Sequence, residues 1–376
     1  MEKRSPCSIE YHFANVNDPR IVKKIDHKLI DVITIVICAV VCGADKWTEI
    51  ELFGKSKSDW FETFLEPPNG IPSHDTFGRI FSLISPDEFE AAFLSWIQAV
   101  TCIAKGQIIV IDGKTLRHSY DKASNKSAIH MVSAWASENR ITLGQVKTSE
   151  KSNEITAIPE LLKLLDINGC IVTIDAMGCQ KDIAEQIISQ GGDYILALKE
   201  NQKKLYQDVK LFFEDALERG VEDIPYAHCQ TVDGDHGRIE TRDYYLTSDI
   251  AWLQGQENWK GLKSIGMVIS VRENGEKVSR ESRFFICSTS GDVNRFAKGV
   301  RSHWGIENSV HWVLDVAFNE DDSRIRKGHA AENMSIVRHM ALNMLRHEKA
   351  EKRGIEAKRK RAGWDNAYLL KVLGTC

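Results

Sequence analysis

Two aspartates stand where short apolar segments of the sequence end, a position from which a carboxylate can reach a catalytic site. Asp112 follows residues 108–111, and Asp175 follows residues 170–174. Apolar runs of this length are typical of central strands that are buried on both faces. If the two strands are neighbours, their carboxylates lie close together and repel each other unless a cation lies between them. We therefore interpret the pair as ligands of a hard divalent metal ion rather than as acids that share a proton.

Each aspartate taken alone has a simpler interpretation, in which its carboxylate only caps the turn between a strand and a loop. A further acid, Glu307, lies in a segment that also holds Trp304, His311 and Trp312. An acid among aromatic and apolar neighbours is a better candidate for a functional role than an acid in water.

Length and composition describe an ordinary protein without export or membrane signals. A chain of 376 residues exceeds what one hydrophobic core usually serves, so two or three structural units are expected. Nine cysteines without a CxxC pair predict neither a disulfide framework nor a zinc site, and they favour the reducing cytoplasm. The most apolar stretch, residues 29–42, is too short to span a bilayer, so we expect a buried helix there and no membrane partner.

The charge distribution matters more than the net charge of −4, which by itself argues weakly against a nucleic-acid partner. Residues 346–361 hold eight Lys/Arg against three Glu and end in four consecutive cations. The alternatives are a phosphate-binding patch and a solvated helix end. We expect residues 351–376 to form a basic C-terminal tail.

Residues 1–104 have the spacing of helices. A turn at residues 67–70 precedes Ser73 and Ser85, each of which is well placed to cap a following helix. Helix, turn and helix are compatible with a DNA-reading module, but plain helical bundles share this pattern. Both interpretations stay open.

From residue 105 the periodicity changes to that of a mixed α/β fold. The expected strands cover residues 108–112, 128–135, 141–147, 171–175 and 194–198, with helices before the last two. Three meandering strands followed by α/β units give a mixed sheet with helices on its faces. Residues 199–297 change to short alternating strands and are interpreted as an insertion, and residues 298–347 return to helical spacing.

Several segments of this chain match motifs of a known family. They are residues 112–117, 150–155, 175–180 and 303–316. In this order, and over nearly the whole chain, they resemble the H-repeat-associated insertion-sequence transposases. The resemblance implies a ribonuclease-H-like mixed sheet flanked by helices, with a catalytic triad of the DDE type. Carried over by position, the triad is Asp112, Asp175 and Glu307.

The resemblance also implies a division of the chain and a cofactor. The expected parts are a helical N-terminal domain at 1–104, which is a candidate for binding DNA ends; a catalytic core at 105–198 and 298–350; a β-rich insertion domain at 199–297; and the basic tail at 351–376. Three carboxylates can hold two Mg²⁺ or Mn²⁺ ions about 3.5–4 Å apart, one at the attacking oxygen and one at the leaving oxygen. Carboxylates suit this role because Mg²⁺ prefers oxygen ligands.

The sequence departs from related transposases around the glutamate. Those enzymes often carry Tyr, Arg and Lys seven before, four before and seven after it, where this chain has Val300, His303 and Leu314. The phosphate contacts of such basic residues must therefore come from elsewhere. The expected DNA-binding residues are Lys114, Arg117, Arg301, Asn308, Arg324, Arg326 and Lys327.

Glu307 has rival acids nearby in the sequence. On a helix, Glu307 shares a mostly apolar and aromatic face with His303, Trp304, Val310, His311 and Leu314, as expected of a helix packed on a sheet edge. Asp315 lies about 80° further round the helix, and the acids at 320–322 fall where helical spacing has faded. We expect those acids to be solvated or paired with Arg324 and Arg326.

The function that follows from the resemblance is that of a DNA transposase, which cleaves element ends and joins them to a target. Its expected partners are double-stranded DNA and other copies of the chain in a homo-oligomeric DNA complex, in the bacterial cytoplasm at the nucleoid. Two alternatives remain open. One is a metal-dependent nuclease without strand transfer, and the other is an inactive or domesticated DNA-binding relic. Paired inverted repeats in the flanking DNA would favour the transposase.

Overall fold

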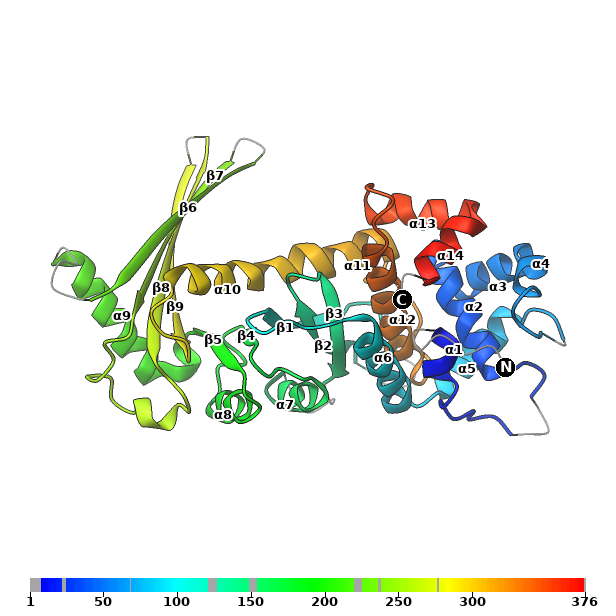
Figure 1. Cartoon of the computed structure of the whole chain (residues 1–376), viewed down its shortest axis with the longest axis horizontal. Coiled ribbons are helices and arrows are strands. Elements are labelled where there is room, and N and C mark those ends of the chain that lie inside the picture. Colours follow the sequence, from blue (N-terminus) through cyan, green and yellow to red (C-terminus); the bar gives the residue numbers. More distant parts are fainter. Residues whose placement is uncertain are drawn as a thin grey trace.

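The computed structural model describes residues 8–21, 25–67, 69–120, 127–148, 154–219, 225–235, 238–275 and 277–374. The molecule is elongated, with long strands at one end and a helical bundle at the other (Figure 1). The first and last described helices, α1 (Ile9–Phe13) and α14 (Asn366–Gly374), both lie in the bundle. The bundle is therefore built from the two ends of the chain, and the sheet from its middle.

Five strands form the central part of the sheet. They are β1 (Ile108–Leu116), β2 (Ile129–Ala136), β3 (Ile141–Lys147), β4 (Ile171–Ile174) and β5 (Asp193–Leu198). Their order is β3-β2-β1-β4-β5; β4 is parallel to β1 and β5, and β2 is antiparallel to both of its neighbours. The apolar runs that predicted these strands are buried on both faces, because helices cover the sheet on both sides. The predicted ribonuclease-H-like mixed sheet is confirmed.

Three helices enclose these strands. On one face lie α7 (Glu154–Leu164) and α8 (Lys181–Ser189), and on the other α10 (Val293–Ile306) runs across β1, β4 and β5. The residue predicted to cap α7, Asn153, lies outside the described residues.

The segment 199–297, which we predicted to be a β-rich insertion, contributes its strands to the same sheet as the core. After α9 (Lys203–Glu218), its strands are β6 (Ala227–Asp235), β7 (Arg238–Thr247), β8 (Ser264–Asn274) and β9 (Lys277–Cys287). The last strand pairs antiparallel with β5, from Ile195 opposite Cys287 to Leu198 opposite Phe284. One nine-stranded sheet results. The end of β9 is buried like a core strand, because β5 needs a partner on its open edge.

The helical bundle surrounds α2 (Leu29–Val41), which is buried along almost its whole length. Its neighbours are α1 (Ile9–Phe13), α3 (Trp47–Ser56), α12 (Ala330–His347) and α13 (Ile355–Trp364). The remaining helices of the bundle are α4 (Ser58–Phe61), α5 (His74–Leu83), α6 (Pro86–Val100) and α14 (Asn366–Gly374). The caps of α5 and α6 are Ser73 and Ser85, as predicted. None of the described helices is long and apolar enough to cross a membrane.

The predicted basic tail is folded into α13 and α14, so that expectation is wrong. Lys358 and Arg359 are 6% and 3% exposed. The Arg359 guanidinium donates to the Val40 carbonyl at 2.8 and 3.0 Å, to the Ala317 carbonyl and to the Asp45 carboxylate at 2.7 Å. Val40 and Ala317 lie in the last turns of α2 and of α11 (Trp312–Phe318), where unsatisfied carbonyls favour a cation. These cations therefore hold helix ends together.

Candidate active site

Asp112 and Asp175 lie at the point where the parallel pairing of β1 and β4 stops. The last pair is Ile111 opposite Ile174, so each aspartate comes next on its strand. We predicted that β1 ends at Asp112; instead it continues to Leu116 along β2. Asp112 is therefore fixed by a strand on one side and faces a cavity where its other neighbour has ended.

Glu307 follows α10, which lies on the face of the sheet opposite to α7 and α8. The helix α10 ends at Ile306 and passes into a π-helical turn, Glu307–His311, before α11. Such turns are rare and are frequently found at functional sites. His311 Nδ1 lies 3.4 Å from Glu307 Oε2 and 3.8 Å from Asp112 Oδ2. The turn thus brings Glu307 and His311 to Asp112.

The three predicted triad residues line one cavity of about 660 Å³. Its wall also contains His303 and Trp304 of α10, Arg283 of β9, and Lys199 just after β5. The Arg283 guanidinium lies 4.2 Å from the centroid of the Trp304 ring. The cavity therefore combines the three acids with two cations at its edge, and its lining also includes Glu200 and Glu281, the latter paired with Arg283 at 2.8 Å.

The pKa values of the three acids are shifted in different directions. Burial raises the pKa of Asp112 to about 7, and the nearby carboxylates of Glu307 and Asp175 add to this, whereas His311 opposes it. Burial also raises the pKa of Asp175. His311 holds the pKa of Glu307 below its ordinary value. A divalent cation would offset the repulsion between carboxylates that helps to raise the pKa of Asp112. These three acids therefore fit a metal ion.

Asp175 both caps a turn and faces the cavity. Its Oδ1 accepts hydrogen bonds from the backbone N–H groups of Met177 (2.9 Å) and Gly178 (3.2 Å). Its Oδ2 has no hydrogen-bond partner among the described residues, which leaves that oxygen for a ligand. The two interpretations that the sequence left open therefore apply to two oxygens of one carboxylate.

Sequence reasoning missed two residues that line this cavity, Lys199 and Arg283, and one that lies beside its acids, His311. His311 was placed on the face of Glu307 without a role, although the i, i+4 spacing of the two residues was visible. Lys199 and Arg283 had no signal, because the strand pairing of β5 with β9 brings them to the site. Part of one predicted motif, residues 150–153, lies outside the described residues.

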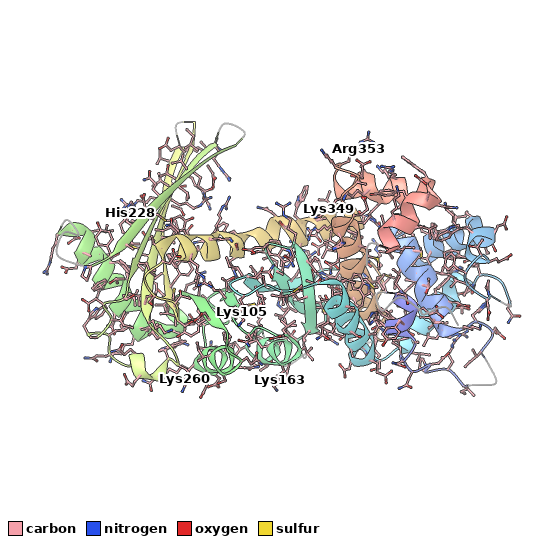
Figure 2. The ribbon with its side chains drawn as sticks, in the orientation of Figure 1. Lys105, Lys163, His228, Lys260, Lys349 and Arg353 are labelled. Carbon is pink, nitrogen blue, oxygen red and sulfur yellow. The ribbon has the colours of Figure 1, made fainter. Side chains whose placement is uncertain are left out.

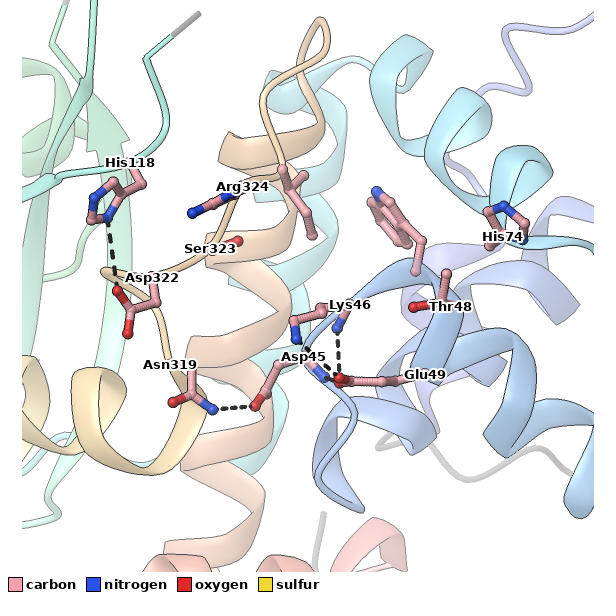
Figure 3. Close-up of a pocket in the computed structure, with 12 residues that line it drawn as sticks. Asp45, Lys46, Thr48, Glu49, His74, His118, Asn319, Asp322, Ser323 and Arg324 are labelled. Atoms are coloured by element: carbon pink, nitrogen blue, oxygen red, sulfur yellow. Dashed lines mark hydrogen bonds and ion pairs between the residues drawn. The ribbon is translucent and has the colours of Figure 1, made fainter.

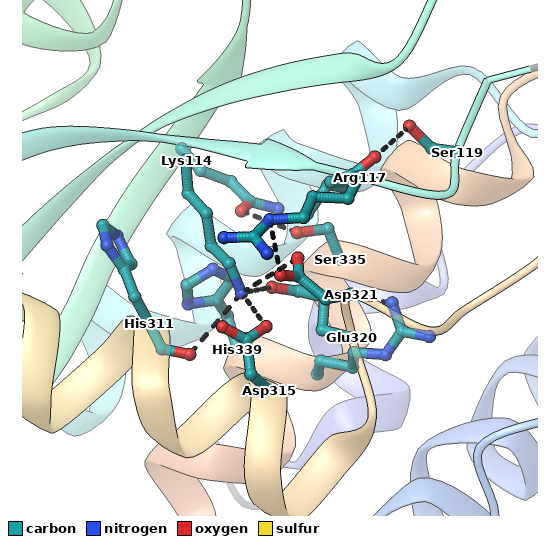
Figure 4. Close-up of polar contacts among 12 residues, drawn as sticks. Lys114, Arg117, Ser119, His311, Asp315, Glu320, Asp321, Ser335 and His339 are labelled. Carbon is teal, nitrogen blue, oxygen red and sulfur yellow. Dashed lines mark hydrogen bonds and ion pairs between the residues drawn. The ribbon is translucent and has the colours of Figure 1, made fainter.

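Lys114 was predicted to bind DNA phosphates, but its ammonium group is already surrounded by acids (Figure 4). It forms ion pairs with Asp315 and with Glu320, the latter at 2.9 Å, and its side chain is 12% exposed. Glu320 is buried and lies 3.8 Å from Arg338. The expectation that Asp315 and Glu320 are solvated or paired with Arg324 and Arg326 is therefore wrong, because Lys114 and Arg338 neutralise them inside the protein.

The other predicted DNA contacts lie in three places. Arg117 is exposed but pairs with Asp321 at 3.1 Å, and Arg301 lies 3.4 Å from Asp233. Asn308 is exposed beside Glu307. Arg326 is half-buried and donates to the His118 carbonyl at 2.8 Å. Their roles in DNA binding stay predictions.

Arg324 and Lys327 are exposed on the segment before α12. Arg324 lines a groove of about 730 Å³ between this segment and α3, where Asn319 donates to Asp45 at 2.8 Å (Figure 3). A connected groove contains Lys327 and also Arg79 of α5. Elsewhere the surface cations are scattered: Lys163 and Lys260 lie along one long edge of the molecule and Lys349 and Arg353 along the other (Figure 2).

Comparison with known proteins gives matches along the chain. The family described as "Transposase DDE domain" matches residues 103–344, and the family "DDE_Tnp_1-associated" matches residues 11–97. The Escherichia coli O157:H7 protein named "Putative transposase YncI" is 46% identical, over 94% of this chain and 91% of its own length. The Escherichia coli K12 protein named "H repeat-associated putative transposase YhhI" is 42% identical over 96% of both chains.

Among solved structures, a cryo-EM structure of a piggyBac transposase synaptic complex with hairpin DNA aligns with this chain. The alignment covers 97% of this chain and 77% of that chain, with 11% identity and a TM-score of 0.45.

Proposed function

This chain belongs to the transposase DDE domain family, and we propose that it cleaves the DNA ends of an insertion sequence and joins them to a target with the help of divalent metal ions. The observation that carries the proposal is the cavity in which Asp112, Asp175 and Glu307 meet. These acids come from two neighbouring strands and from a helix on the opposite face of the sheet. Burial raises the pKa of Asp112 and of Asp175, and a bound divalent cation would offset this cost of holding their charges inside the protein.

Asp112, Asp175 and Glu307 would hold Mg²⁺ or Mn²⁺, which when bound activates an attacking oxygen and stabilises a leaving oxygen. The chain itself positions the DNA. Lys199 at the edge of the cavity is placed to bind a phosphate oxygen, and so is Arg283 if a phosphate replaces its present partner, the Glu281 carboxylate at 2.8 Å. They would take over the role of the basic residues that related enzymes carry around the glutamate.

DNA would reach this cavity as double-stranded element ends and target. An element has two ends, so a homo-oligomer would provide one cavity for each end. The exposed Arg324 and Lys327 beside the groove before α12 are suited to contact the phosphate backbone further along the duplex.

The two alternatives predict different products. A nuclease of the same fold would cleave without joining, and a DNA-binding relic would do neither. The complete set of acids favours an active enzyme over a relic, because a decayed site would have no reason to keep three repelling carboxylates together.

The proposal is tested with purified full-length protein, DNA that carries the inverted repeats flanking its gene, and a target plasmid. We expect cleavage and joined products with Mg²⁺ or Mn²⁺ and neither in EDTA. Asp175→Asn should abolish both reactions while the protein still binds end DNA. Full cleavage in EDTA would contradict the metal mechanism, and metal-dependent cleavage without joined products would favour the nuclease.

A further inference from the structure

His311 differs from the other buried histidines in having no good hydrogen-bond partner. It is 5% exposed. Its Nε2 is buried and has no hydrogen-bond partner among the described residues. Its Nδ1 faces Glu307 Oε2 at 3.4 Å, which is long for an N–H···O hydrogen bond. The imidazole therefore points at the two carboxylates without being held firmly by them.

His130 shows what a structural histidine looks like in the same protein. One of its ring nitrogens lies 2.8 Å from Thr115 Oγ1 and the other lies 2.7 Å from Glu154 Oε1. Both nitrogens are thus satisfied at ordinary distances. A histidine that only supported the fold beside Glu307 would be expected to have similar partners.

The spacing around His311 matches that of ligands around one metal ion. One donor atom each from Asp112, Glu307 and His311 lies within 4.8 Å of the others. With bonds of about 2.1 Å, neighbouring ligands of a six-coordinate ion lie roughly 3.0 Å apart and opposite ligands roughly 4.2 Å apart. The distances of 3.4 and 3.8 Å from Nδ1 to the two carboxylates fall between these values. Asp175 is not part of this group.

We propose that His311 is a nitrogen ligand, through Nδ1, of the metal ion that Asp112 and Glu307 bind. The inference rests on the proposed function, because it concerns the same metal site. Imidazole suits transition metals, whereas Mg²⁺ strongly prefers oxygen. A site of two carboxylates and one imidazole therefore selects Mn²⁺ over Mg²⁺, and Asp175 is left to share a second ion bound mainly by oxygen.

The test measures metal binding and does not depend on activity. Full-length protein is loaded with Mn²⁺, bound ion is quantified by electron paramagnetic resonance, and electron spin-echo envelope modulation then reports any ¹⁴N nucleus coupled to the manganese. We expect ¹⁴N modulation in the wild type and its loss in His311→Asn, together with a Mn²⁺ affinity lower by about tenfold or more. The affinity for Mg²⁺ should change less.

His303→Asn is the matched control. His303 is a histidine of the cavity wall near Glu307, but its Nδ1 lies 3.3 Å from Thr173 Oγ1 and it is not in the three-ligand group. Its ¹⁴N modulation should equal that of the wild type. Circular dichroism checks that each variant is folded. If His311→Asn does not fold, His311→Gln is used in its place.

The possible failures are distinguishable. Bound Mn²⁺ without ¹⁴N modulation in the wild type would overturn the role of His311 and leave the proposed function standing. Modulation that persists in His311→Asn or disappears in His303→Asn would also overturn it. A wild-type protein that binds no Mn²⁺ in the cavity would contradict the proposed function as well.

Discussion

Strand β1 contributes one residue, Asp112 or Lys114, to each of two neighbouring groups of charged side chains. The two groups differ in how their negative charges are balanced. Around Lys114, the carboxylates of Asp315 and Glu320 face two cations, Lys114 itself and Arg338. Around Asp112, the acids Glu307 and Asp175 lie close enough to raise its pKa, and the His311 side chain opposes that rise. The first group is neutralised inside the protein, and the second is not.

This difference teaches how the charge of each group is used. Side chains at i and i+2 of a strand point to the same face, so Asp112 and Lys114 both face the helical segment that follows α10. The Lys114 group fixes α11, since its ammonium also lies 3.5 Å from the His311 carbonyl. The Asp112 group opens into the cavity and leaves its charge to a ligand. We therefore expect changes in the first group to affect stability and changes in the second to affect chemistry.

Glu307→Gln should give the largest effect, on catalysis alone. The substitution keeps the shape of the side chain but removes a ligand charge. Loss of several kcal/mol of transition-state stabilisation corresponds to a decrease in cleavage rate of roughly a thousandfold or more. Because the Glu307 side chain is 67% exposed, we expect little change in the free energy of unfolding and end binding within a few-fold. The measurements are cleavage kinetics, a DNA-binding titration and urea unfolding.

Asp315→Asn is the matched control for Glu307→Gln. It removes an acid of the neutralised group, eight residues along the chain, and should leave measurable cleavage. If Asp315→Asn were inactive while Glu307→Gln cleaved DNA, the third ligand would be misassigned and the contrast between the two groups would fail.

Lys114→Met should give the largest loss of stability. It leaves Glu320, whose side chain is 1% exposed, with Arg338 alone at 3.8 Å. Removing one partner of a buried ion pair costs about 3–5 kcal/mol. Urea unfolding at pH 7 measures this loss. Lys163→Met, which breaks an exposed pair with Glu160, should cost no more than about 1 kcal/mol.

The loss in Lys114→Met should depend on pH. Burial alone would raise the pKa of Glu320, but Lys114 and Arg338 hold it below 4.5. The stability that Glu320 contributes is thus present above its unfolded pKa and is lost as the pH falls through its folded pKa. The difference between wild type and variant should therefore shrink as the pH falls below 4.5. A constant difference would indicate lost packing rather than lost charge.

Asp112→Asn should stabilise the metal-free protein at neutral pH. This effect is smaller than the loss of stability in Lys114→Met and has the opposite sign. The pKa of Asp112 rises from 3.8 to about 7 on folding. An acid with a raised pKa contributes stability that is present below its unfolded pKa and is lost as the pH rises through its folded pKa. At about 1.4 kcal/mol per pKa unit, the stability recovered at pH 8 is at most about 4 kcal/mol.

The measurement compares urea unfolding of wild type and Asp112→Asn in EDTA at pH 8 and pH 4. The variant should be more stable at pH 8, and the gain should vanish near pH 4. Destabilisation at pH 8 would show that the charged carboxylate has a compensating partner, and would contradict the contrast with the Lys114 group.

The strands and caps that depend on local pattern could be predicted from the sequence. The range of β3 is Ile141–Lys147 in both, and Ser73 and Ser85 cap their helices. Features that depend on contacts with residues far away in the sequence could not be predicted. The strand β6 has no apolar pattern of its own, because its residues from Gln230 to Gly234 are exposed and it is held by pairing with β7. The extension of β1 beyond Asp112 depends on β2 in the same way.

The candidate acids of the site could be predicted from the sequence, but the charged groups that surround them could not. The motifs point to Asp112, Asp175 and Glu307, and the cavity contains all three. Whether a cation is free for DNA cannot be read from residue type, since Lys114 and Arg359 are both occupied by partners far away in the sequence. The π-helical turn likewise has no local sequence signal.

The smallest expected effect is on the salt dependence of DNA binding. It should distinguish exposed cations, which can contact phosphates, from cations that already have partners in the protein. Arg324 and Lys327 are exposed, whereas Lys358 and Arg359 bond to helix ends and Lys360 pairs with Glu356. Each lost phosphate contact lowers the slope of log affinity against log salt by about 0.9.

Arg324→Ala with Lys327→Ala should therefore reduce that slope by about 2, and the affinity for end DNA by a modest factor at physiological salt. Lys360→Ala with Arg361→Ala removes two cations that pair with Glu356 and Glu351; this pair is the control and should leave the slope unchanged. Binding titrations between 50 and 200 mM salt measure both. If only the control pair lowered the slope, the DNA would lie over the C-terminal helices, and their cations would serve DNA binding as well as the fold.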